Sequence, residues 1–308
     1  MRPEHVTLVE VGPRDGLQNE AQAVSAEAKV ALVHSLQAAG LKEIEVTSFV
    51  SPRWVPQMAD NAQVMAKIQR VPGVRYSVLV PNVRGWESAC HSQPDEIVVF
   101  AAASEAFSQR NINCSIEESM LRFEPVVKAA KEQGVKVRAA ISCALGCPYQ
   151  GTVSADEVER VVRLFKDLGV DHCGVADTLG VGTPDRVQEA MERALRHFPL
   201  HEVSGHFHDT YGQALSNIYG CLQMGLHIFD TSVAGLGGCP YAKGATGNVA
   251  TEDVLFMLQG LGIETGIQME PLIDTVAMVS GLLQRPPVSR VGRALLAKRA
   301  ASEGACST

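Results

Sequence analysis

The sequence predicts a closed barrel of eight parallel strands surrounded by helices, the (β/α)8 or TIM-barrel class of α/β fold, with additional C-terminal helices. Short runs of β-branched residues alternate with longer helical stretches along most of the chain. Roughly eight such repeats in ~230 residues match the length of this barrel. The turn after the first predicted strand, at residues 11–16, lacks the G-x-G-x-x-G pattern of a dinucleotide-binding open sheet. We therefore favour the barrel over that alternative.

Eight short segments rich in β-branched and apolar residues predict the strands. In chain order they are residues 6–11, 43–47, 75–80, 96–101, 136–142, 172–176, 202–208 and 228–233. The stretches between them carry apolar residues at helical spacing, as at Val30 and Val33. They predict helices at residues 25–39, 60–69, 83–90, 116–133, 154–167, 184–197 and 213–224. Ser154 with Glu157 has the spacing of a capping box, and Gly169 stands where that helix should end.

A glycine-rich segment at residues 234–248 follows the last predicted strand. Three further helical stretches come after it, at residues 251–261, 270–283 and 288–301. No linker or low-complexity stretch separates them from the repeats. We therefore expect one catalytic domain over residues 1–308, with the barrel at about 6–233, an active-site loop at about 234–248 and a helical appendage at about 249–308.

Charge and hydropathy argue against two classes of partner. The net charge of −7 and pI of about 5.7 disfavour nucleic-acid binding, which rests largely on basic patches. No apolar run approaches the ~20 residues of a membrane-spanning helix. The N-terminus passes into a predicted strand without the apolar region of a signal peptide, so we expect a cytoplasmic protein. The 8 cysteines include no CxxC pair, and we expect reduced thiols.

The seventh predicted strand carries a histidine pair at its carboxyl end. Because side chains alternate between the two faces of a strand, His206 and His208 point to the same side. Asp15 follows the first strand and adds a carboxylate, and Asn248, beyond the eighth strand, can add a carbonyl oxygen. The carboxyl ends of all barrel strands face one site. This mixed nitrogen and oxygen set suits Mg²⁺ or Mn²⁺, with Zn²⁺, Co²⁺ and Fe²⁺ as alternatives.

Three other residues at this end of the barrel have a chemical interpretation. Arg14 offers a permanent positive charge where an enolate oxygen develops. Glu45, on the second strand, either holds Arg14 in place or transfers a substrate proton. We favour the first role. Cys239 lies in a glycine-rich loop that can move and approach a ligand, so we interpret it as an acid or base.

These motifs closely resemble the 3-hydroxy-3-methylglutaryl-CoA lyase family, in matching order from about Val6 to about Leu283. The Gly-Leu-Gly-Gly-Cys-Pro-Tyr loop at residues 235–241 is specific to these lyases. Arg-Asp-Gly and His-x-His alone mark only the wider superfamily that includes isopropylmalate and homocitrate synthases. The other matching segments are residues 10–20, 48–52, 177–180 and 205–210.

The resemblance implies a metal-dependent retro-Claisen cleavage of 3-hydroxy-3-methylglutaryl-CoA to acetyl-CoA and acetoacetate. The ligands that it implies for the metal, Mg²⁺ or Mn²⁺, are Asp15, His206, His208 and Asn248. It also implies catalytic roles for Arg14 and Cys239 and supporting roles for Glu45 and Asp177. We expect Arg14 to stabilise the enolate oxygen, Cys239 to protonate the enolate carbon, and Asp177 or a histidine ligand to take the hydroxyl proton.

Partners follow from the same resemblance. We expect Arg14, Gln18 and Ser48 to contact an acyl-CoA substrate. A homodimer is expected from the family, and the C-terminal helices offer apolar side chains for it at Leu282, Leu283, Leu295 and Leu296.

Other activities on the same scaffold are kept as alternatives. One is a lyase for a related 3-hydroxyacyl-CoA of the isohexenylglutaryl or citramalyl type, and a less favoured one is a condensing acyltransferase. Thr47, Gly174 and Ala176 depart from the residues expected in the family, and we expect them to approach the acyl-CoA and to influence substrate identity. A protein that only binds acyl-CoA would lack some of the polar set, yet every member is present.

Overall fold

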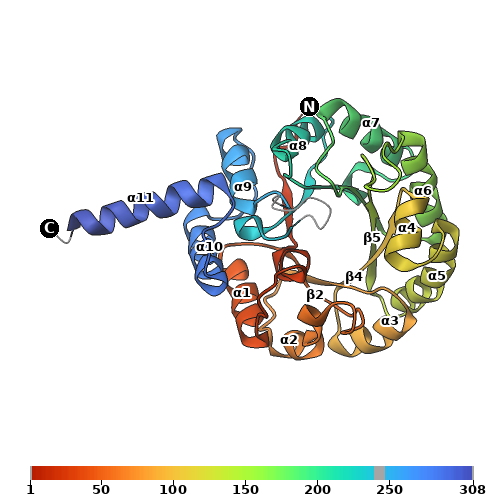
Figure 1. Ribbon diagram of the computed structural model, residues 1–308, viewed down its shortest axis with the longest axis horizontal. Coiled ribbons are helices and arrows are strands. Elements are labelled where there is room, and N and C mark those ends of the chain that lie inside the picture. The colour runs from red at the N-terminus through yellow and green to blue at the C-terminus, as the bar shows by residue number, and fades with distance from the viewer. Residues whose placement is uncertain (1, 239–246, 307–308) are drawn as a thin grey trace.

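Eight parallel strands close into a barrel in a computed structural model of the protein, which describes residues 2–238 and 247–306 (Figure 1). Each strand pairs with its sequence neighbours, and β8 pairs with β1. The strands are β1 Thr7–Glu10, β2 Glu43–Ser48, β3 Arg75–Leu79, β4 Glu96–Ala102, β5 Lys136–Ser142, β6 His172–Asp177, β7 Val203–Phe207 and β8 Ile228–Thr231. The predicted fold class is confirmed, and so are all eight predicted strands, to within two residues at either end.

Helices surround the barrel between successive strands (Figure 1). The seven predicted ones are present, as α1 Ala26–Ala38, α2 Asn61–Lys67, α3 Val83–Ala89, α5 Ile116–Glu132, α6 Ala155–Leu168, α7 Pro184–Leu195 and α8 Ala214–Gln223. Ser154 and Glu157 form the predicted capping box, and Gly169 ends α6 with a φ of +81°. Helix α4, Glu105–Ile112, was not predicted because it is short and polar. Its one sequence signal is the N-cap Ser104, whose side chain accepts a hydrogen bond from the amide of Phe107.

Short non-α helical turns complete the connections. They are the π-helical turn η1 Gly12–Gly16 and the 3₁₀ turns η2 Pro56–Met58, η3 Cys90–Ser92, η4 Leu200–Glu202 and η5 Val233–Gly235. Two of them, η1 and η5, directly follow β1 and β8. They therefore lie at the barrel end where active sites of this fold occur.

The three predicted C-terminal helices are α9 Thr251–Gly260, α10 Met269–Leu283 and α11 Arg290–Cys306. Helices α9 and α10 occupy the ring between α8 and α1, and α11 points away from the barrel (Figure 1). The Ser35 and Thr275 hydroxyls join α1 to α10 at 2.7 Å. The division into one domain with an appendage stays a prediction, but two of the three helices of that appendage help to cover the barrel. None of the helices within the described residues has the length and apolar character needed to cross a membrane.

The barrel wall separates an apolar layer from a polar interior. On β5, Val137, Ala139 and Ile141 are fully buried, while Arg138 between them reaches Ser204 and Asp230 on other strands. This alternation follows from the two-residue period of a strand. The apolar face packs against the helices, and the inward face supplies charged groups beneath the mouth of the barrel.

Candidate active site

The three side chains expected to hold a metal come together at the barrel mouth. One potential ligand atom from each of Asp15, His206 and His208 lies within 4.8 Å of the others. Asp15 comes from the turn η1, His206 lies near the carboxyl end of β7, and His208 directly follows that strand. Asp15 and His206, which are 191 positions apart in the sequence, thus lie in one site, as the convergence of the strand ends at the barrel mouth predicted.

The position of Asp15 depends on close packing of η1 against the segment after β8. A side chain at Gly16 would place its Cβ 2.7 Å from Cβ of Leu236 and 2.7 Å from Oγ of Ser232. Such contacts are too short for carbon atoms, so only glycine permits this approach. Glycine at this position therefore lets Asp15 face the histidines.

The donor set fits a divalent cation. Burial would raise the pKa of Asp15, but Arg14 and the two histidines outweigh it and hold that pKa well below its usual range. Burial lowers the pKa of His208 to about 4, so its imidazole is neutral at neutral pH. Its Nδ1 is buried without a hydrogen-bond partner among the described residues. An ionised carboxylate and a neutral imidazole are the protonation states that bind metals.

Asn248 joins this group through its side-chain amide. Its Nδ2 donates hydrogen bonds to Oδ2 of Asp15 at 2.7 Å and to the carbonyl of Leu236 at 3.3 Å. The amide nitrogen is thereby used within the protein, and the carbonyl oxygen is left to act as the expected ligand.

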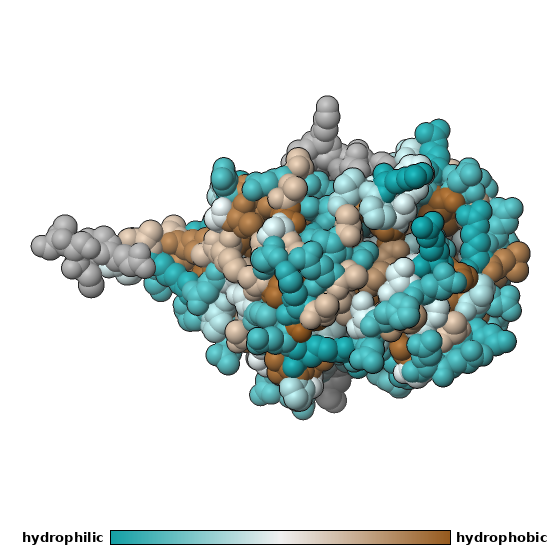
Figure 2. Space-filling model, turned by 90° about the horizontal axis from the view of Figure 1, so that it is seen from below, coloured by the Kyte–Doolittle hydropathy of each residue, from teal (hydrophilic) through white to brown (hydrophobic). Residues whose placement is uncertain are grey.

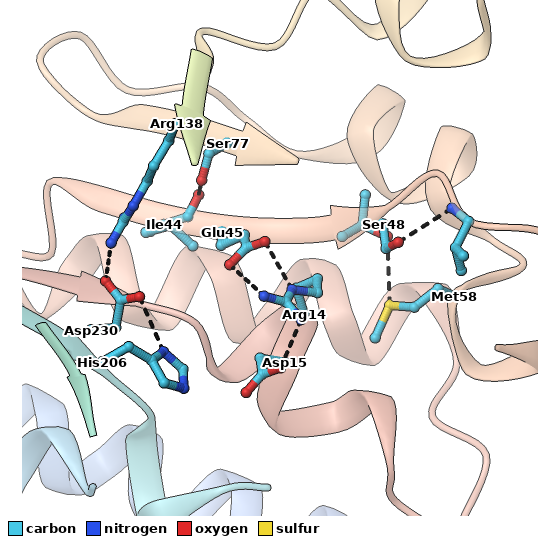
Figure 3. Close-up of polar contacts among 12 residues, drawn as sticks. Arg14, Asp15, Ile44, Glu45, Ser48, Met58, Ser77, Arg138, His206 and Asp230 are labelled. Atoms are coloured by element: carbon cyan, nitrogen blue, oxygen red, sulfur yellow. Dashed lines mark hydrogen bonds and ion pairs between the residues drawn. The ribbon is translucent and has the colours of Figure 1, made fainter. Parts of the chain in front are cut away.

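Arg14 is fixed by the carboxylates of Asp15 and Glu45 at the candidate metal site (Figure 3). Its Nε and Nη2 donate to the two oxygens of Glu45 at 2.8 and 3.0 Å, and its Nη1 donates to Oδ1 of Asp15 at 2.7 Å. This two-point pairing agrees with the role in which Glu45 holds Arg14. The guanidinium is thus a rigid positive charge next to the candidate metal site formed by Asp15, His206 and His208.

Two charged residues of the site were missed at the sequence level. Oδ2 of Asp230 lies 3.1 Å from Nδ1 of His206, and Arg138 pairs with the other oxygen of the same carboxylate (Figure 3). Arg138 also donates to Oγ of Ser204 at 2.8 Å. A charged residue inside an otherwise apolar strand was the available signal, in Ile-Phe-Asp-Thr of β8 and Lys-Val-Arg-Ala of β5.

Asp177 has a different environment from the one expected of a base. Its carboxylate is fully buried and accepts hydrogen bonds from the backbone amides of Val181 at 3.1 Å and Gly182 at 2.7 Å. Asp177 therefore holds the loop after β6, and it is not part of the metal-binding group. Its role in taking the hydroxyl proton stays a prediction that this arrangement does not favour.

Ser48 and Gln18, two of the residues expected to contact the substrate, differ in how exposed they are. Ser48 is fully buried, and its Oγ accepts a hydrogen bond from the amide of Val50 at 3.2 Å, within its own turn. Gln18 is half-buried just after η1. Of the two, Gln18 is therefore the more accessible to a ligand.

The expectation that Thr47, Gly174 and Ala176 approach the acyl group stays a prediction, and the structure shows protein atoms close to the first two. The Thr47 hydroxyl is buried and donates to Sδ of Met58 at 3.7 Å. A Cβ at Gly174 would lie 3.0 Å from Oγ of Ser204 and 3.8 Å from Nε of Arg138. Any side chain at position 174 would crowd the Ser204 hydroxyl, which already accepts a hydrogen bond from Arg138.

Cys239 lies outside the described residues, so its predicted role as an acid or base stays a prediction. The two ends of its loop meet beside the site: a Cβ at Gly247 would lie 2.7 Å from the amide nitrogen of Gly238, and one at Gly237 2.9 Å from Nδ2 of Asn248.

The chain matches the HMGL-like family over residues 5–279. It is 55% identical over 296 residues to the 3-hydroxy-3-isohexenylglutaryl-CoA/hydroxy-methylglutaryl-CoA lyase of Pseudomonas aeruginosa, covering 96% of this chain and 99% of that relative. The crystal structure of hydroxymethylglutaryl-CoA lyase from P. aeruginosa superposes with a TM-score of 0.94 at 55% identity, covering 96% of this chain and 99% of that one.

An HMG-CoA lyase from Acinetobacter baumannii, solved in complex with coenzyme A and 3-methylmalate, superposes with a TM-score of 0.91 at 31% identity. This match covers 94% of the present chain and 95% of the other. The family match spans most of the chain, and the barrel, the histidine pair and the Arg14-Asp15 turn occur together within it. The protein therefore belongs to the HMGL-like family.

Proposed function

We propose that this protein is a metal-dependent carbon–carbon lyase that cleaves 3-hydroxy-3-methylglutaryl-CoA to acetyl-CoA and acetoacetate. One observation carries the proposal: in a chain of this family, Asp15, His206 and His208 converge beside the fixed cation Arg14. The full-length similarity to P. aeruginosa hydroxymethylglutaryl-CoA lyase supports the same reaction.

The metal is proposed to be Mg²⁺ or Mn²⁺, held by Asp15, His206, His208 and Asn248. When bound, the ion supplies Lewis-acid polarisation of the substrate's tertiary hydroxyl group. The proposed ligand atoms include both oxygen and nitrogen, and this mixture suits Mn²⁺ at least as well as Mg²⁺.

Arg14 stabilises the charge that develops as the carbon–carbon bond breaks. Bond cleavage leaves the enolate of acetyl-CoA, whose oxygen carries negative charge. Glu45 and Asp15 already hold the guanidinium in place, so it does not have to reorient when that charge appears. Cys239 then protonates the enolate carbon.

Cleavage also requires a group that takes the proton of the tertiary hydroxyl. Asp177 is committed to the backbone of its own loop. The expected acceptors stay Asp177 and a histidine of the candidate metal site, and the Asp177→Asn variant distinguishes the two possibilities.

A second substrate is a specific alternative. The P. aeruginosa relative is named for both 3-hydroxy-3-isohexenylglutaryl-CoA and hydroxymethylglutaryl-CoA. Both substrates present the same 3-hydroxyglutaryl group to the reacting atoms, and they differ in the branch at carbon 3. Competition between the two acyl-CoAs in one assay gives the ratio of their kcat/KM values and so decides which is preferred.

Coenzyme A recognition and self-association complete the proposal. The A. baumannii structure contains coenzyme A, which supports an acyl-CoA substrate for this chain. Hydrophobic residues gather at the base of the projecting helix α11, where Leu295 and Leu296 are half-buried, and these support a homodimer (Figure 2). Leu283 is buried within its own chain and contributes less. Light scattering on the purified protein would give the oligomeric state, and a cytoplasmic location stays a prediction.

The proposed chemistry is tested through Cys239. The Cys239→Ser variant should lose turnover by about 100-fold or more, because an alcohol is a much weaker proton donor than a thiol, while its affinity for Mn²⁺ stays at the wild-type value. Equal losses of turnover and Mn²⁺ affinity would contradict the assignment of Cys239 as the acid.

A further inference from the structure

Asp230 bridges two partners in the barrel interior. One oxygen of its carboxylate faces Nδ1 of His206 at 3.1 Å, and the other pairs with Nη2 of Arg138 (Figure 3). His206 and Asp230 stand opposite each other in the parallel register of β7 and β8. The side chains of all three residues are at most 15% exposed. The contact is therefore built into the strand pairing and shielded from water.

We propose that Asp230, oriented by Arg138, is a positioning residue that sets the tautomer and direction of His206 so that its Nε2 faces the divalent cation. The inference rests on the proposed function, because it concerns the metal site of that lyase. It assigns roles to two residues that do not touch the metal themselves.

The hydrogen-bonding capacity of the groups fixes where the proton lies. The Asp230 carboxylate forms an ion pair with the guanidinium of Arg138, which is always protonated. An ionised carboxylate can only accept hydrogen bonds. The proton of the contact must sit on Nδ1 of His206, and the lone pair for a metal is left on Nε2.

Arg138 fixes which oxygen faces the histidine. Its guanidinium has donors only, so it requires an acceptor atom on its side of residue 230. Oγ of Ser204 accepts a second hydrogen bond from the same Nη2 at 2.8 Å and keeps the guanidinium in place. Residue 230 can then present only its second oxygen to His206.

An amide at position 230 would reverse the arrangement. In Asp230→Asn the carbonyl oxygen must stay with Arg138, so the NH₂ group would face Nδ1 of His206. Nδ1 would then have to accept, the proton would move to Nε2, and the ligand atom would be blocked. The shape of the side chain is almost unchanged, so a loss of metal binding would report the tautomer rather than the packing.

Glu96 on β4 offers a matched control. It is a buried carboxylate in the same barrel interior, 3.7 Å from Nη1 of Arg75, and its side chain is 8% exposed. Glu96→Gln makes the same change from carboxylate to amide without touching His206.

Mn²⁺ binding to the metal-free protein, measured by electron paramagnetic resonance and calorimetry, tests the proposal. Asp230→Asn is expected to weaken Mn²⁺ binding by about 10- to 100-fold, the usual cost of losing a carboxylate behind a histidine ligand, and Glu96→Gln by less than about 2-fold. If the two variants bound Mn²⁺ equally well, the positioning role of Asp230 would be overturned, while the proposed metal site would stand. Failure of the folded wild-type protein to bind Mn²⁺ would overturn the metal site of the proposed function, and this inference with it.

A double variant separates tautomer control from general damage. In Arg138→Met with Asp230→Asn, the amide is free to turn its oxygen toward Nδ1. Mn²⁺ binding should then be tighter than in Asp230→Asn alone. A further loss of affinity would overturn the orienting role of Arg138.

A measurement on the wild-type protein does not depend on the folding of any variant. In protein labelled with ¹⁵N at histidine and loaded with Mg²⁺, the His206 resonances should show the proton on Nδ1. A proton on Nε2 instead would overturn the proposal.

Discussion

Asn248 donates a hydrogen bond from its Nδ2 to Oδ2 of Asp15 at 2.7 Å, across 233 positions of sequence. The contact joins the turn after β1 to the segment beyond β8. These two segments carry the first and the last of the expected ligands in chain order. The contact fixes the Asp15 carboxylate from one side while Arg14 holds the other oxygen. Each of these contacts has a measurable consequence.

Asn248→Ala should weaken Mn²⁺ binding by about 10-fold, since it removes both an expected ligand and the donor that orients Asp15. Calorimetric titration with Mn²⁺ measures the effect. Asn217→Ala is the control, because Asn217 is a buried asparagine that donates to the carbonyl of Gly182. It should lower thermal stability and leave the Mn²⁺ affinity unchanged. A similar loss of affinity in both variants would show that general destabilisation is the cause.

Arg14→Lys should lower kcat by about 100- to 1000-fold, because an ammonium cannot reproduce the two-point contact with Glu45 that fixes the charge. Mn²⁺ affinity should change much less than kcat, because Arg14 is not a ligand. Steady-state kinetics and Mn²⁺ titration on the same preparation separate the two effects. A variant with wild-type kcat would remove Arg14 from the chemistry.

Asp177→Asn should lower the stability of the protein rather than its turnover. An asparagine can accept only one of the two backbone hydrogen bonds, and the buried donor left unpaired costs about 1–3 kcal/mol. Urea unfolding measures this loss. If kcat fell by about 100-fold or more with unchanged stability, Asp177 would instead be the general base of the original expectation.

Glu252 predicts a pH dependence of stability. It is fully buried, accepts hydrogen bonds from the amide of Ala234 and the hydroxyl of Ser289, and burial raises its pKa to about 7. The folded state therefore holds a proton that the unfolded chain releases. The resulting stabilisation is complete below the pKa of the unfolded chain, near 4.5, and is lost as pH rises through about 7.

Between about pH 5 and pH 8, the free energy of unfolding of the wild-type protein should fall relative to Glu252→Gln by up to about 3 kcal/mol. The glutamine does not titrate, so the difference between the two proteins isolates this carboxyl group. Urea denaturation across that range measures it. A pH-independent difference would show that Glu252 keeps the same charge on unfolding.

Local patterns in the sequence were sufficient to predict the barrel and the closeness of Asp15, His206 and His208. The alternation of His206 and His208 depends only on strand geometry. The number of strand–helix repeats depends only on strand and helix lengths. Helices α9 and α10 were recognised as helices, but their place in the ring follows from packing against α8 and α1, which no local pattern encodes.

Pairings between distant strands lay beyond sequence reasoning. Arg138 and Asp230 are 92 positions apart, and their contact depends on how far the guanidinium reaches across the barrel interior. For Asp177, position in a strand suggested a catalytic role that its hydrogen bonds do not favour. It ends a barrel strand, as a catalytic residue would, but its side chain turns back to the amides of Val181 and Gly182. The position of a residue in a strand does not determine which hydrogen bonds it makes.

The most direct measurement is to incubate the purified protein with 3-hydroxy-3-methylglutaryl-CoA in the presence of Mn²⁺ or Mg²⁺, and again with a chelator. Acetoacetate and acetyl-CoA are assayed separately. Both products are expected in equal amounts with metal, and neither product with chelator. If the folded, metal-loaded protein released no acetoacetate, the proposed substrate would be wrong.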